Sequence, residues 1–178
     1  MSDEKTTGRQ ITHVVVPGTF DPVTLGHLDV IRRARRLFPQ VTVAVAASVN
    51  KRGVGTAFSL DERTHMIKEA LSEAGADKDC GIDVVPFEGL LVDFCHGIGA
   101  GGVVKGLRAM TDFENELQQA DLNNHMAPDL ESIFVMSNPE YGYVSSSVVR
   151  ELSAMGGDVS MLVPANVCEH LKEHYSCR

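Results

Sequence analysis

The 178-residue sequence has no tryptophan, and aromatic residues make up only 6% of it. It also lacks an apolar run of about 18 residues, the length that a membrane-spanning helix needs, so we expect no membrane partner. Residues 1–12 are polar and lack the apolar centre of a signal peptide. We therefore expect a flexible N-terminal arm over residues 1–12 and a single domain over residues 13–178.

Paired cysteines and an excess of positive charge are absent as well. The four cysteines have no C-x-x-C spacing, which argues against a zinc ribbon or a redox pair and favours the reducing cytoplasm. The net charge of −8 at pH 7 disfavours a general nucleic-acid surface, so we expect no nucleic-acid partner. An acidic protein can still bind phosphates through a few focused cations.

The sequence does contain a regular alternation of strand-like and helix-like segments. Strands are predicted near residues 13–16, 41–47, 82–87, 103–104 and 132–136, with helical patterns between them. Segment 41–47 is nearly all apolar, which is typical of a strand covered on both faces. The alternation predicts a Rossmann-like α/β fold, a doubly wound parallel sheet of five strands with helices on both faces.

The most informative stretch covers residues 14–31. A β-branched run ends there at a Pro-Gly turn, and Thr24 is the predicted N-cap of a helix whose first turn holds Gly26 and His27. The unpaired N–H groups of such a turn attract anions, and a glycine lets a ligand approach the backbone closely. His27 adds a donor that can carry charge. The stretch therefore predicts a phosphate site that lacks a Walker lysine motif.

Polar, glycine-rich or cationic stretches follow four of the predicted strands, at residues 17–27, 48–52, 105–108 and 137–147. Because the carboxyl ends of parallel strands meet at one edge of a sheet, these stretches should converge on one crevice. Lys51 is expected to contribute to it, whereas Arg52 is expected to be solvated. The crevice is predicted to take a nucleoside triphosphate and a second phosphorylated substrate.

Several segments resemble known nucleotidyltransferases. Gly18-Thr19-Phe20-Asp21-Pro22 followed by Thr24-Leu25-Gly26-His27 resembles the signature of the superfamily that carries a T/H-x-G-H motif. The blocks Gly106-Leu107-Arg108-Ala109 and Asp112-Phe113-Glu114-x-Glu116, with the serines at 145–147, make the chain similar to the phosphopantetheine adenylyltransferase family. This similarity runs from about residue 14 to residue 170.

The resemblance implies adenylyl transfer from ATP to 4′-phosphopantetheine with Mg²⁺, which gives dephospho-coenzyme A and pyrophosphate. It implies catalytic roles for His27, Lys51 and Arg108, and no metal ligand. The implied ATP contacts are Thr19, Phe20, His27, Gly106, Leu107, Arg108, Glu116, Tyr141, Gly142, Tyr143, Val144, Ser145, Ser146 and Ser147. The implied contacts with phosphopantetheine are Thr19, Lys51, Leu91 and Lys105. The family forms homohexamers, and coenzyme A is implied as an inhibitor beside the product.

Two positions depart from the family pattern. Lys105 stands where the family commonly has arginine, so a point charge replaces a bidentate fork. Val16 stands where relatives often carry an aromatic side chain. Leu90, next to Leu91, is expected to be a plain core residue.

Two other functions stay open from the residues alone. One is a nucleotidyltransferase that acts on another phosphorylated acceptor. The other is a regulator that binds ATP without turnover. The presence of His27, Lys51 and Arg108 together argues against the regulator.

Overall fold

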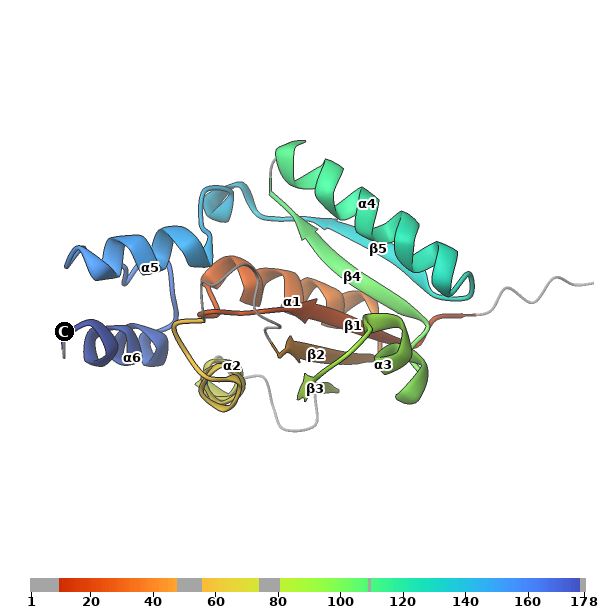
Figure 1. Cartoon of the computed structure of the whole chain (residues 1–178), viewed down its shortest axis with the longest axis horizontal. Coiled ribbons are helices and arrows are strands. Elements are labelled where there is room, and N and C mark those ends of the chain that lie inside the picture. Colours follow the sequence, from red (N-terminus) through yellow and green to blue (C-terminus); the bar gives the residue numbers. More distant parts are fainter. Residues whose placement is uncertain (1–9, 48–55, 74–80, 109, 177–178) are drawn as a thin grey trace, which may run out of the picture.

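The computed structural model describes residues 10–47, 56–73, 81–108 and 110–176, and it confirms the Rossmann-like fold (Figure 1). Five parallel strands lie in the order β3-β2-β1-β4-β5. The strands are β1 (His13–Gly18), β2 (Gln40–Ala46), β3 (Ile82–Phe87), β4 (Gly102–Leu107) and β5 (Glu131–Met136). The helices are α1 (Leu25–Leu37), α2 (Leu60–Glu73), α3 (Leu91–Gly97), α4 (Met110–Met126), the 3₁₀ turn η1 (Pro139–Tyr141), α5 (Ser146–Ala154) and α6 (Ala165–Ser176).

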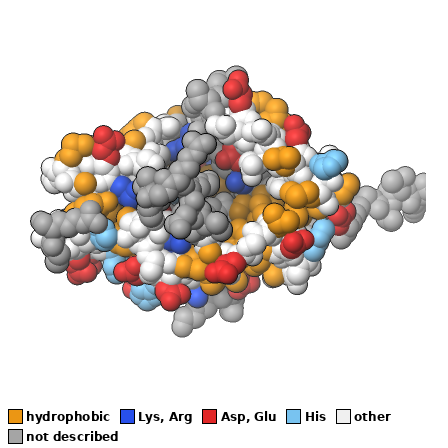
Figure 2. Space-filling model, viewed as in Figure 1, with side chains coloured by type: hydrophobic (Ala, Val, Ile, Leu, Met, Phe, Trp, Pro, Cys, Tyr) orange, Lys and Arg blue, Asp and Glu red, His pale blue; other side chains and the backbone are white. Residues whose placement is uncertain are grey.

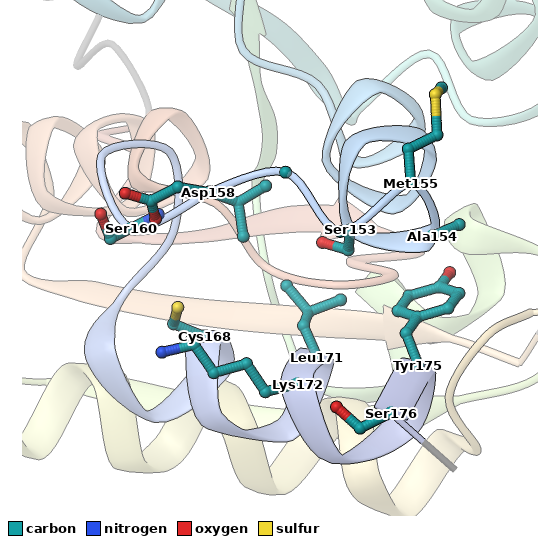
Figure 3. A pocket seen from close by; sticks show the side chains of 13 residues that line it. Ser153, Ala154, Met155, Asp158, Ser160, Cys168, Leu171, Lys172, Tyr175 and Ser176 are labelled. Atoms are coloured by element: carbon teal, nitrogen blue, oxygen red, sulfur yellow. The ribbon is translucent and has the colours of Figure 1, made fainter. Parts of the chain in front are cut away.

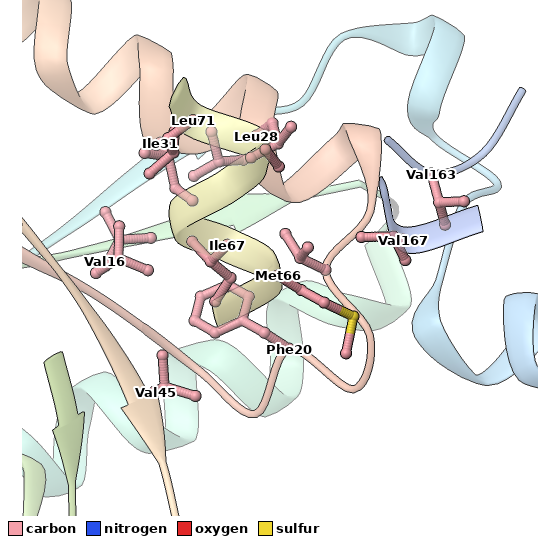
Figure 4. Packing of buried hydrophobic residues seen from close by; sticks show 14 of the residues in the cluster. Val16, Phe20, Leu28, Ile31, Val45, Met66, Ile67, Leu71, Val163 and Val167 are labelled. Atoms are coloured by element: carbon pink, nitrogen blue, oxygen red, sulfur yellow. The ribbon is translucent and has the colours of Figure 1, made fainter. Parts of the chain in front are cut away.

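Alternate residues of the strands fill two cores, one on each face of the sheet. Val14 and Val43 belong to the larger core, to which α1, α2 and α6 contribute, and Figure 4 shows part of its packing. Val15 and Val103 belong to the smaller core, to which α3 and the segment between α4 and β5 contribute. Because both faces are covered, the inner strands are apolar at successive positions, as the sequence predicted.

The two central strands separate toward their carboxyl ends. β1 pairs with β2 along its whole length, but it pairs with β4 only at Val14 and Val15. The chain continues from β1 to β2 on one side of this gap and from β4 to β5 on the other. Such a switch point, outside the carboxyl ends of the strands, is where open parallel sheets bind ligands.

β4 is longer than the sequence predicted. We expected a strand at 103–104 followed by a loop with Lys105, but β4 continues to Leu107 and pairs there with β5. Gly106 concealed the strand, because glycine is depleted in strands. The position requires glycine, because an added Cβ would lie 2.5 Å from Cγ2 of Val30 in α1. Helix α1 therefore lies directly against β4 beside the gap.

Two local expectations also change. Leu90 is 54% exposed and not a core residue, because it precedes α3 as its N-cap.

Residues 1–9 of the expected arm lie outside the described residues. Ile11, however, packs against the larger core, and the carbonyl of Thr12 accepts a hydrogen bond from the N–H of Gln40 at 3.0 Å. The folded domain therefore includes Ile11 and Thr12.

The structure also bears on the membrane and cysteine predictions. Across the described ranges, no helix is both long enough and apolar enough to cross a membrane. Cys95 and Cys168 are buried free thiols. Cys80 and Cys177 fall outside the part of the chain that the structure describes.

Candidate functional site

A crevice of about 310 Å³ opens where β1 and β4 separate. It is lined by Val16, Pro17, Gly18, Thr19, Phe20, Thr24, Gly26, His27, Val30, Val104, Lys105, Gly106, Arg108, Glu116, Ser137 and Val144. Three of the four polar stretches thus meet at one edge of the sheet, as the sequence predicted. The fourth, residues 48–52 with Lys51 and Arg52, lies outside the described residues.

The first turn of α1 faces this crevice and is closed by a reciprocal capping box. Thr24 is the N-cap, and its Oγ1 accepts a hydrogen bond from the N–H of His27 at 3.3 Å. In return, Nδ1 of His27 accepts a hydrogen bond from the N–H of Thr24 at 3.0 Å. Histidine takes the place that glutamate or glutamine usually has in such a box. The capping residues are therefore also residues that line the crevice.

These contacts determine the state of the His27 imidazole. Because Nδ1 accepts a hydrogen bond, the proton of the neutral ring lies on Nε2. Burial and the positive charge of Arg108 lower the pKa of His27 to about 4. The ring of Phe20 packs edge-on against the imidazole, with 5.1 Å between the ring centroids. His27 is thus a neutral and oriented N–H donor, and not the charged donor that the sequence had left open.

Two cations stand on the β4 side of the crevice, each held by another element. Nζ of Lys105 lies 3.2 Å from Oε2 of Glu116 in α4, and both side chains are partly buried. Arg108 donates a hydrogen bond to the carbonyl of Val144 at 2.7 Å. This bond connects the end of β4 to the segment before α5. Contacts within the protein therefore already orient both cations.

The three serines at the start of α5 have different structural roles. Ser145 is the N-cap, and its Oγ accepts a hydrogen bond from the N–H of Val148 at 3.2 Å. Oγ of Ser146 donates to the carbonyl of Pro22 at 2.8 Å, which ties α5 to the loop after β1. Ser147 is exposed. The triplet lies beside the crevice, next to Val144, which lines it.

Other predicted contacts lie at or beyond the margin of the crevice. Tyr141 approaches α1, since a Cβ added at Gly26 would lie 3.3 Å from its Cβ, whereas Tyr143 is 70% exposed. Leu107 is buried at the end of β4. Leu91 begins α3 and packs against the smaller core. Of the predicted residues that the structure describes, Leu91, Leu107, 141–143 and 145–147 are not among those that line the crevice.

Sequence reasoning missed the buried charges beneath the crevice. Arg63 of α2 is 2% exposed and Asp21 is 4% exposed. Asp21 also forms an ion pair with Arg150, at 3.3 Å between Oδ2 and Nη1. A signal for Arg63 was present, because it lies three and four residues before Met66 and Ile67 on the apolar face of its helix. A charge at such a position needs buried partners.

A larger cavity, of about 820 Å³, lies between α5 and α6 (Figure 3). Its lining includes Ser153, Asp158, Cys168 and Lys172. It lies at the C-terminal end of α5, away from the serines at 145–147. In the described part of the chain, none of the site residues predicted from the sequence lines it. The smaller crevice, with its cations and its capped helix, is therefore the candidate site.

Comparisons with known proteins found relatives that are similar in sequence. The sequence model of the family described as cytidylyltransferase-like matches residues 15–152. The phosphopantetheine adenylyltransferase of Thioalkalivibrio sulfidiphilus is 49% identical over 158 residues, which are 89% of this chain and 94% of that protein. The one from Rubrobacter xylanophilus is 45% identical over 162 residues, 91% of this chain and 94% of that protein.

The solved structures add a likeness of fold. A bifunctional NMN adenylyltransferase/ADP ribose pyrophosphatase from Francisella tularensis matches with a TM-score of 0.72 at 17% identity. The match covers 94% of this chain and 50% of that chain.

Proposed function

Because the chain belongs to the cytidylyltransferase-like family, and within it to the phosphopantetheine adenylyltransferases, we propose that ATP and 4′-phosphopantetheine react in the crevice between β1 and β4. The activity is adenylyl transfer in coenzyme A biosynthesis, which gives dephospho-coenzyme A and pyrophosphate. The convergence of His27, Lys105 and Arg108 on this gap is the observation that carries the assignment of the site.

The reaction needs alignment and charge stabilisation, because the acceptor phosphate is itself the nucleophile. Its oxygen attacks the α-phosphorus of ATP while the bond to the pyrophosphate breaks in line. Negative charge grows on the α-phosphoryl oxygens and on the pyrophosphate, and donors aimed at those atoms lower the barrier. We assign the Nε2–H of His27 to the α-phosphoryl group, and the cations Arg108 and Lys51 to the charged phosphates.

The two substrates are proposed to occupy different sides of the crevice. ATP would contact Arg108, Glu116 and the segment 141–147, where the free N–H groups at the start of α5 can hold phosphate. The acceptor would contact Thr19, Lys51 and Leu91. Lys105 joins the two sides, since it pairs with Glu116 and is proposed to reach the acceptor phosphate. The product dephospho-coenzyme A, and coenzyme A as an inhibitor, would compete with ATP and phosphopantetheine for both sides of the crevice.

Magnesium is proposed to enter with ATP. Mg²⁺ in such sites is bound chiefly by the nucleotide phosphates and water, with one or two carboxylates, and it neutralises charge on the leaving group. Among the described residues, no group of three or more His, Cys, Asp or Glu side chains could hold a metal ion. Glu116, the carboxylate that lines the described part of the crevice, is paired with Lys105, so we propose that the nucleotide phosphates and water hold the ion. Both substrates are metabolites of the cytoplasm, which is the proposed location.

We also propose assembly into a homohexamer. Helix α4 exposes two apolar pairs on opposite sides, Phe113 with Leu117 and Leu122 with Met126. Helix α5 exposes Val148 and Leu152, and its C-cap Met155 is exposed as well. Figure 2 shows apolar side chains gathered in the region where Figure 1 places α3 and α4. Exposed apolar patches of this kind mark interaction surfaces. Two separate surfaces suit a closed hexamer of dihedral symmetry, which needs two kinds of contact.

Pyrophosphate release tests the function. ATP with phosphopantetheine should give pyrophosphate and dephospho-coenzyme A, whereas ATP alone should give none. Nicotinate mononucleotide and glycerol phosphate serve as control acceptors. Turnover with a control acceptor alone would favour a different nucleotidyltransferase, and ATP binding without pyrophosphate release would favour a regulator.

A further inference from the structure

We infer that Arg63 is a positioning residue for the acceptor side of the crevice, an inference that rests on the proposed function. Arg63 lies in the first turn of α2 and is 2% exposed. A guanidinium so deeply buried needs acceptors for its N–H groups, because unpaired buried donors cost stability. Its acceptors come from three separate segments of the chain.

Three backbone carbonyls accept hydrogen bonds from this one side chain. Nε donates to the carbonyl of Phe58 at 3.1 Å, in the segment before α2. Nη1 donates to the carbonyl of Ala46, the last residue of β2, at 3.0 Å, and to that of Thr19, in the loop after β1, at 2.5 Å. β1 and β2 pair as far as Gly18 and Val45, so the guanidinium joins the two chains at the residues just beyond their last pair.

The end of β1 leads into a proposed acceptor contact. Thr19 is exposed and lines the crevice. The buried carboxylate of Asp21 balances the charge, and it accepts hydrogen bonds from the N–H groups of Ala57 at 2.9 Å and Phe58 at 3.0 Å. Arg63 thus sets where Thr19 stands, although it does not itself line the crevice in the described structure.

Other bonds hold the ATP side. Arg108 donates to the carbonyl of Val144, and Ser146 donates to that of Pro22. Neither bond involves Arg63. The Ser146 bond does reach the loop after β1 that Thr19 begins, so a change at Arg63 should weaken the use of phosphopantetheine more than the use of ATP, a split that a general loss of stability would not produce.

Lysine at this position separates geometry from charge. The planar guanidinium addresses several carbonyls from two different nitrogens, whereas lysine has one nitrogen. Arg63→Lys keeps the charge and loses the fork. Arg35→Lys is a matched control, because Nη1 of Arg35 also donates to a backbone carbonyl, that of Phe38 at 3.3 Å, at the end of α1 away from the crevice.

The test is steady-state pyrophosphate release by the full chain, with each substrate varied in turn, together with the melting temperature. Arg63→Lys should raise the KM of phosphopantetheine severalfold, because a single lysine nitrogen cannot hold the carbonyl of Thr19 as well as those of Ala46 and Phe58. The KM of ATP should rise less, and Arg35→Lys should change neither. Should Arg63→Lys fail to fold, Arg63→Gln, which keeps an N–H donor without the charge, takes its place.

The outcomes separate this inference from the function on which it rests. Equal rises in both KM values, or a lower melting temperature with both KM values unchanged, would overturn the positioning role alone. A wild-type chain that releases no pyrophosphate with phosphopantetheine would overturn the proposed function, and this inference with it.

Discussion

His27 lies where its hydrogen bond, its neighbours and its helix all favour the neutral imidazole. Nδ1 accepts the N–H of Thr24, so a protonated ring would have to break the capping box. The positive charge of Arg108 and the partial positive charge of the helix N-terminus both oppose an imidazolium. At the scale of the single residue, the site therefore gains a donor of fixed direction whose state does not change near neutral pH.

His27 should accordingly titrate with a pKa of about 4, below its ordinary 6.5. Between about pH 4 and pH 6.5, the unfolded chain then binds more protons at His27 than the folded chain does. The contribution of His27 to stability is therefore complete above about pH 6.5 and is lost as the pH falls toward 4. NMR titration of the imidazole nitrogens should show the Nε2–H tautomer and no protonation at pH 6. Protonation near the ordinary pKa would contradict this hydrogen-bond arrangement.

Removing the imidazole should impair catalysis more than folding. His27→Ala should fold and lose roughly 10²–10³ in kcat, the usual effect of deleting one donor to transition-state charge. His65→Ala is the control, since that imidazole is an exposed side chain of α2. If His27→Ala kept nearly full kcat with both substrates, His27 would have no place in the mechanism.

Lys105 is one of the two positions that the sequence analysis found to depart from the family pattern, and its ion pair with Glu116 adds a second expected effect to the test. Lys105→Arg should tighten phosphopantetheine, because arginine can form a bidentate contact, with charge-assisted bonds worth about 1.5–3 kcal/mol each. Lys105→Ala should weaken phosphopantetheine about tenfold or more. It should also disturb ATP binding, because Glu116 loses its partner. Calorimetry with both ligands measures this, and unchanged phosphopantetheine affinity in Lys105→Ala would remove the residue from the acceptor side.

At the scale of the element, the start of α5 divides one run of serines among different tasks. Ser145 caps the helix, Ser146 bonds the loop after β1, and Ser147 presents its hydroxyl at the surface. A helix N-terminus also offers unpaired N–H groups to an anion. The element can therefore combine a structural cap with a phosphate contact, and the two roles fall on different serines.

Single substitutions in this triplet should separate the two roles. Ser145→Ala should lower the free energy of unfolding by about 1 kcal/mol, the usual effect of losing an N-cap. Ser147→Ala should raise the KM of ATP and leave the melting temperature unchanged. Kinetics and thermal unfolding of both variants provide the measurements. An unchanged KM of ATP in Ser147→Ala would leave the serines with structural roles only.

At the scale of the whole molecule, the exposed apolar side chains of α4 and α5 are the proposed assembly contacts. Light scattering should give a mass close to six times the chain mass of 19.3 kDa. Leu122→Lys, on the 50% exposed side chain of α4, should give smaller species, because a charge in an apolar contact is costly. Leu37→Lys is the control, because the Leu37 side chain is 64% exposed at the end of α1 and lies on neither α4 nor α5. A monomeric wild type would contradict the proposed assembly.

Local patterns were sufficient to predict the elements and much of the crevice. The β-branched run at 14–16 forms a strand, and Thr24 caps α1, because both features depend on neighbours in the sequence. The rule that parallel strands present their carboxyl ends at one edge then brought the stretches at 17–27, 105–108 and 137–147 together. The exact end of β4 was missed, because a glycine whose role is close packing reads locally as a turn.

By itself, the sequence determined the fold class, the capped helix that opens toward the site and the residue types that we propose bind phosphate. Only the tertiary structure decided where β1 parts from β4, which tautomer His27 adopts beside Arg108, and which carbonyls Arg63 holds. The reason is physical. Periodicity and capping are set by residues within about one or two helical turns. Buried donors instead find acceptors wherever the packed chain brings them, as Arg63 does with Thr19 and Ala46.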